Sequence, residues 1–150
     1  MQEYLTPNFS LDELTKSESA ARFGIQNIPS PQVKQNMKAV AQQMEKVRLF
    51  LNAPIVVNSM YRSPELNRKI GGSVTSSHVE GWAIDFISPR FGSPEKIARF
   101  LVAKFKEAGI KFDQIIMEGT WVHLSFAPKL RGQVLQATFK NGKASYSAFN

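Results

Sequence analysis

The fold of this chain is decided by the stretch Ser76-Ser-His-Val-Glu-Gly-Trp-Ala-Ile-Asp-Phe86, a loop that leads into a short apolar strand. Successive side chains of a strand point to opposite faces, so Ile84 and Phe86 share one face and Asp85 points to the other. The segment before the strand is rich in glycine and serine, which predicts a loop that ends at His78. One face of the sheet is therefore expected to be apolar and the other to carry polar groups.

The same alternation predicts a second strand at Trp121 to Phe126. Its even-numbered residues are apolar and share one face, whereas His123 and Ser125 share the other. A tight turn at Gly119 joins this strand to one that we expect over residues 115–117. The two neighbouring strands thus repeat the division into an apolar and a polar face.

Serine followed by proline marks three predicted helix starts, because serine caps the free amides and proline suits the first helical position. The longest apolar stripe, at spacings of three and four, follows Ser30-Pro31. The expected helices are a brief one opened by the capping box Ser10-Leu-Asp-Glu13, the main one over residues 31–51, a short one over residues 65–69, and one from Ser93-Pro94 to Gly109.

The remaining segments complete the predicted fold class. Residues 55–62 form an extended segment, and Asn141-Gly142 predicts a two-residue hairpin turn between residues 134–140 and 143–146. The expected elements run along the chain as helices first, then strands mixed with helices, then strands. This order indicates an α+β domain with an antiparallel sheet and helices packed on one face. At 150 residues, without repeats or linkers, residues 1–150 are expected to form a single domain.

The chain contains no cysteine, so any metal must bind to histidine and carboxylate. Its two histidines, His78 and His123, could converge with Asp85 on the polar side of the sheet. Three such ligands leave a fourth tetrahedral position open, which is typical of catalytic zinc. By spacing alone the alternative stays open that these are a loop histidine, a strand histidine and a carboxylate paired with an arginine.

The net charge of +7 favours an anionic partner: nucleic acid, a membrane surface or a cell-envelope polymer. The basic residues are scattered and lack the aromatic pattern of an RNA-binding sheet, so we expect no specific nucleic-acid binding. We also expect no membrane insertion, because no apolar run has membrane length. The N-terminus lacks the features of a secretory signal, which predicts synthesis in the cytoplasm. We expect a monomer.

Four motifs in order resemble the D-Ala-D-Ala metallopeptidase family, zinc enzymes that cut peptidoglycan and include bacterial carboxypeptidases and phage endolysins. They are Tyr61-Arg-Ser-Pro-Glu-Leu-Asn67, Gly71-Gly-Ser73, the opening stretch, and Trp121-Val-His-Leu-Ser125. Asn8-Phe-Ser-Leu-Asp-Glu-Leu14 and Asn27-Ile-Pro29 also look like the phage and prophage branch. The resemblance covers residues 8–126 and implies a fold that hedgehog signalling domains share.

The resemblance implies that His78, Asp85 and His123 bind one zinc ion, with a zinc-bound water as the nucleophile. Arg62 matches the arginine that contacts the substrate in this family. A guanidinium near the metal makes physical sense, since it can bind a peptide carboxylate or steady an oxyanion. The alternative for Arg62 is a surface ion pair.

The general base is expected at Glu118. Several relatives have an acidic residue three positions before the last histidine, but Thr120 occupies that position here. A turn at Gly119 would bring the Glu118 carboxylate to the attacking water, and Asp113 is the next candidate. Ser76 and Trp121 are expected to contact substrate, although serine here could simply shape the loop and either Trp82 or Trp121 could belong to the core.

The implied function is hydrolysis of a peptide bond in the peptide stems of peptidoglycan. An endopeptidase of phage origin fits a small basic chain, which would reach the wall after release or be carried in the virion. The alternatives are a D-Ala-D-Ala carboxypeptidase and a wall-binding module of the same fold without turnover.

Overall fold

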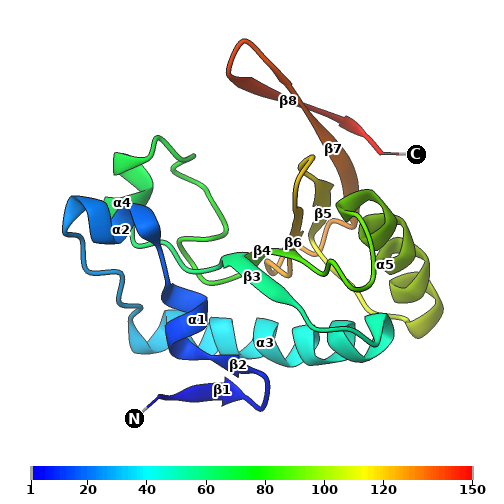
Figure 1. Cartoon of the computed structure of the whole chain (residues 1–150), viewed down its shortest axis with the longest axis horizontal. Helices are drawn as coiled ribbons and strands as arrows, with labels where there is room; N and C mark the ends of the chain where they lie inside the picture. The colour runs from blue at the N-terminus through cyan, green and yellow to red at the C-terminus, as the bar shows by residue number, and fades with distance from the viewer. Residues whose placement is uncertain (1, 150) are drawn as a thin grey trace.

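The computed structural model describes residues 2–149 (Figure 1). Its helices are α1 (Leu11–Thr15), α2 (Glu18–Phe23), α3 (Pro31–Leu51), α4 (Pro64–Lys69) and α5 (Pro94–Ala108). Its strands are β1 (Tyr4–Thr6), β2 (Phe9–Ser10), β3 (Val56–Ser59), β4 (Ala83–Ile87), β5 (Gln114–Met117), β6 (Val122–Ser125), β7 (Gln133–Lys140) and β8 (Lys143–Ala148). Within this part of the chain, the helices are too short or too polar to span a bilayer.

The main sheet has the strand order β3-β4-β6-β5-β7-β8, and β1 and β2 form a separate small pair. All neighbours in the main sheet are antiparallel except β5 and β7, which run parallel. The predicted α+β class with a mostly antiparallel sheet is confirmed. The β1–β2 pair and α2 were not predicted, because their segments are too short for a periodic pattern.

The predicted serine caps are confirmed at every helix that carries one. Ser30, Ser63 and Ser93 each accept a hydrogen bond from the amide three residues later, with proline at the start of the helix. Ser10 does the same for α1. These caps satisfy amides that a helix cannot pair internally, which fixes where each helix begins.

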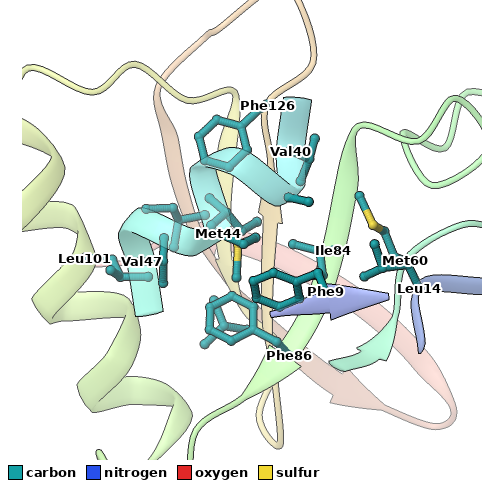
Figure 2. Close-up of a cluster of buried hydrophobic side chains, with 14 of the residues drawn as sticks. Phe9, Leu14, Val40, Met44, Val47, Met60, Ile84, Phe86, Leu101 and Phe126 are labelled. Carbon is teal, nitrogen blue, oxygen red and sulfur yellow. The ribbon is translucent and has the colours of Figure 1, made fainter. Parts of the chain in front are cut away.

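The hydrophobic core lies between α3, α5 and one face of the main sheet (Figure 2). The cross-strand register places Ile84 opposite Leu124, and Leu124 opposite Ile115, so these side chains share the face that meets the helices. All three are fully buried, as are Met44 of α3 and Leu101 of α5. The predicted apolar face of the sheet is therefore its packed face.

The beginning of β7 is tied to the residue before β5 by an ion pair between Asp113 and Arg131. The Arg131 side chain donates from Nε to Oδ1 at 2.9 Å and from Nη2 to Oδ2 at 2.8 Å. The amide of Gln133 donates to the carbonyl of Asp113 at 3.0 Å, next to the start of the parallel pairing. This two-bonded contact orients the whole β7–β8 hairpin.

Asp113→Asn is expected to lower the free energy of unfolding by about 1–2 kcal/mol at neutral pH, because a charged hydrogen-bonded pair is lost while Arg131 stays half exposed to water. The hydrogen bonds from Arg131, against the effect of burial, hold the pKa of Asp113 below its usual range. The stabilisation is therefore present above the ordinary pKa of about 4 and is lost as pH falls through the lower folded-state value.

Urea unfolding of both proteins from pH 7 to pH 2 measures this difference. Glu107→Gln, which removes an exposed pair with Lys104, is the control and is expected to change stability by less than ~0.5 kcal/mol. A difference between wild type and Asp113→Asn that does not shrink at low pH would contradict the assignment.

Candidate metal centre

His78 lies in the loop before β4 and is held from behind by the segment that follows β3. Its Nδ1 lies 2.6 Å from the carbonyl oxygen of Met60, which can only accept a hydrogen bond, so Nδ1 carries the proton. The other ring nitrogen, Nε2, lies 3.3 Å from Oδ2 of Asp85. The side chain is only 5% exposed. The hydrogen bond from Nδ1 to Met60 fixes the tautomer that leaves Nε2 free to bind a metal.

Asp85 of β4 and His123 of β6 are directly opposed across the sheet, on the face away from α3 and α5. Asp85 Oδ1 lies 2.9 Å from His123 Nδ1. The potential ligand atoms of His78, Asp85 and His123 all lie within 4.8 Å of one another. The structure thus brings the three residues of the predicted ligand set together.

The donor set fits zinc. Tetrahedral zinc with bonds of about 2.0–2.1 Å places neighbouring ligand atoms about 3.3 Å apart. Asp85 Oδ2 lies 3.3 Å from His78 Nε2, and Asp85 Oδ1 lies somewhat closer to His123 Nδ1, at 2.9 Å. Burial alone would raise the pKa of the Asp85 carboxyl, but interactions with His78 and His123 outweigh it and hold that pKa well below the usual range. Two imidazoles and an ionised carboxylate leave one tetrahedral position open.

Arg62 lies at the side of this cluster and contacts the loop that carries His78. Its Nη2 donates to Ser76 Oγ at 3.2 Å, and the amide of His78 donates to the same oxygen at 3.3 Å. Among the described residues, Arg62 Nε is buried without a hydrogen-bond partner. Burial lowers the pKa of Arg62 and Asp85 opposes this, yet the guanidinium stays charged at neutral pH. A charged guanidinium that lines the cleft favours an anionic or carbonyl ligand.

Glu118 stands at the end of β5, where a turn connects to β6. Its amide donates to the carbonyl of Trp121 at 3.0 Å, which closes the turn. Burial raises the pKa of Glu118 above its usual range, His123 opposes this shift and Asp85 adds to it. The alternative base, Asp113, does not qualify, because its carboxylate is occupied by Arg131.

A cleft of about 800 Å³ joins all the predicted site residues, a size typical of a ligand site. Its lining includes the three potential ligands together with Arg62, Ser76, Glu118 and Trp121. Trp82, the other tryptophan, instead packs against the hydrophobic core. The open question of which tryptophan faces the cleft is thus decided for Trp121.

Asn27, the first residue of the Asn27-Ile-Pro29 motif, is a positioning residue. Its Nδ2 donates to the carbonyls of Thr15 and Tyr61 at 2.8 and 2.9 Å, and its Oδ1 accepts from the amide of Ser63 at 2.7 Å. These bonds hold both sides of Arg62. The signal was available in the Asn-Ile-Pro motif, whose place beside Arg62 becomes visible only in the folded chain.

The sequence profile described as Peptidase M15 matches residues 7–125. Because this match covers well over half of the chain, the chain belongs to the peptidase M15 family, a family of metallopeptidases. The match agrees with the expected range of residues 8–126 and ends before β7. No curated protein matches the chain.

Asn27→Ala is expected to lower the free energy of unfolding by about 1–3 kcal/mol, because it leaves partly buried backbone groups without partners. The matched control is Asn36→Ala, which removes an exposed hydrogen bond to the carbonyl of Glu80 and should cost less than ~0.5 kcal/mol. Urea unfolding compares the two variants with wild type. Equal effects of the two substitutions would show that Asn27 does not hold this segment.

Proposed function

We propose that this chain is a zinc-dependent peptidase that hydrolyses a peptide bond in bacterial peptidoglycan. The observation that carries the proposal is the cluster of His78, Asp85 and His123 in one cleft with Arg62 and Glu118. Membership of the peptidase M15 family supports the same reaction class. The D-Ala-D-Ala metallopeptidase motifs favour peptidoglycan as the substrate.

Each residue of the site has a separate role in the proposed hydrolysis. Zinc, held by His78, Asp85 and His123, would supply Lewis-acid chemistry that activates water and polarises the scissile carbonyl. Glu118 takes the proton of the attacking water and passes it to the leaving amine. Burial raises the pKa of Glu118 towards neutral pH, which suits a group that must first accept and then donate a proton. The charged guanidinium of Arg62, which lines the cleft, binds the substrate carbonyl or carboxylate.

An endopeptidase of endolysin type is the form of this activity that we propose. The cleft is lined both by Arg62 and Ser76, which lie near His78, and by Leu135 and Phe139 of β7. We infer that a cleft of about 800 Å³ holds substrate on both sides of the scissile bond, whereas a carboxypeptidase needs room for only one terminal residue on the leaving side. The protein is made in the host cytoplasm and acts on the wall after release or from the virion.

Digestion of purified peptidoglycan, followed by mass spectrometry, tests the proposal. An endopeptidase releases stem or cross-bridge fragments, whereas a carboxypeptidase releases free D-alanine alone. If the folded, zinc-loaded protein cleaves none of the chemical types of peptidoglycan, it is instead the non-catalytic wall-binding module.

One zinc ion is expected per chain, bound by His78, Asp85 and His123. His78→Ala and His123→Ala should each lose most of the bound metal, because removal of one of three protein ligands weakens the site strongly. Glu80→Gln, an exposed residue of the same loop, is the control and should retain full occupancy. Metal analysis and calorimetric titration with zinc measure the difference. Full metal content in both histidine variants would refute the ligand assignment.

Glu118→Ala is expected to retain zinc and the fold but to lose ~10² to 10⁴ in turnover, the usual contribution of a general base. The assay is the rate of fragment release from peptidoglycan at saturating zinc, with Glu80→Gln as the control for loss of a carboxylate. Near-native turnover by Glu118→Ala would assign the base to another group.

A further inference from the structure

The β7–β8 hairpin has one apolar face and one polar face. Its register pairs Leu135 with Ala148, Ala137 with Tyr146 and Phe139 with Ala144, and paired residues point to the same side. The alternate positions on both strands are polar or charged from Gln136 to Ser147. This separation of apolar from polar side chains is typical of a hairpin whose apolar face makes contacts.

The apolar face turns towards the metal cluster. Leu135 pairs with Ile116 of β5, and Ile116 pairs with His123, so all three lie on one face of the sheet. Leu135, Phe139 and Tyr146 line the same cleft as Glu118 and His123. Partial burial and the negative charges of Glu118 and Asp85 raise the pKa of Tyr146, in keeping with this position.

Phe139 and Tyr146 are 56% and 54% exposed, so the core does not account for them. Figure 1 shows the hairpin standing out from the sheet, on the side away from α3. The family match ends at residue 125, so this wall of the cleft is additional to the matched peptidase region. Adjacent exposed aromatic side chains beside a catalytic cleft indicate a binding surface.

We propose that Phe139 and Tyr146 form a sugar-binding subsite, which holds a pyranose ring of the glycan strand to which the stem peptide is attached. The inference rests on the proposed function and extends it: the enzyme would recognise the sugar as well as the peptide. Both side chains line the same cleft as the metal cluster, so the glycan strand of a stem peptide bound at the cluster can reach the hairpin.

The chemistry of the hairpin favours a sugar over the peptide itself. Aromatic rings carry a negative face, against which the weakly positive C–H groups of a pyranose pack. Alanine methyl groups and flexible charged side chains present no flat face that matches an aromatic ring, whereas a pyranose does. The phenol of Tyr146 adds a hydrogen-bonding group at the edge of the platform.

The test compares a muropeptide that wild-type protein cleaves with the same peptide after an amidase has removed its sugars. Phe139→Ala/Tyr146→Ala should lower kcat/KM about tenfold on the sugar-bearing substrate, a loss similar to that of a stacked ring in other ligands, and less than twofold on the free peptide. Thr138→Ala/Ser145→Ala, on the opposite face of the hairpin, should leave both values unchanged. Tyr146→Phe, which keeps the ring, should retain most of the wild-type kcat/KM on the sugar-bearing substrate.

Equal loss on the two substrates, or no loss on either, would overturn the sugar subsite while leaving the peptidase proposal intact. A wild-type protein that cleaves no muropeptide, with or without sugars, would instead refute the peptidase proposal. Binding then tests the subsite independently: an N-acetylglucosamine oligosaccharide should shift the NMR signals of Phe139 and Tyr146 in wild type. Unshifted signals, or self-association through this face that the double alanine variant abolishes, would contradict the inference.

Discussion

The site depends on one constraint, the register between β4 and β6. This register sets Asp85 directly opposite His123 on one face and buries Ile84 against Leu124 on the other. A slip by one residue would move the carboxylate and the imidazole into the core and the apolar side chains into the cleft. The burial of apolar surface against α3 and α5 therefore also holds the potential metal ligands in position. The same two strands, β4 and β6, therefore contribute both to the hydrophobic core and to the potential metal site.

The two carboxylates of the cleft have different environments and so different chemistry. The histidines hold the pKa of Asp85 below its usual range, which keeps it ionised as a ligand requires. Burial raises the pKa of Glu118, which suits a group that gains and loses a proton in one reaction cycle. Arg62 contributes positive charge from the loop side, where Ser76 orients it. The opposite shifts of the two pKa values support the proposed roles of Asp85 as ligand and Glu118 as base.

The sequence predicted the elements whose signals are local. The Ser30-Pro31 cap and the stripe after it predicted α3 from end to end, and alternation predicted the faces of β4 and β6. Contacts between distant segments could not be predicted in this way. The bonds of Asn27 to Tyr61 and Ser63 span more than thirty residues, and the parallel pairing of β5 with β7 begins beside the ion pair of Asp113 with Arg131. The position of the hairpin over the cleft follows from that pairing.

The most direct test of the account is a crystal structure of the zinc-loaded protein, with anomalous scattering recorded at the zinc edge. One strong peak per chain is expected, about 2.0–2.1 Å from His78 Nε2, His123 Nδ1 and a carboxylate oxygen of Asp85, with a fourth position open to the cleft beside Glu118. A peak elsewhere, or a zinc closed by a fourth protein ligand, would contradict it.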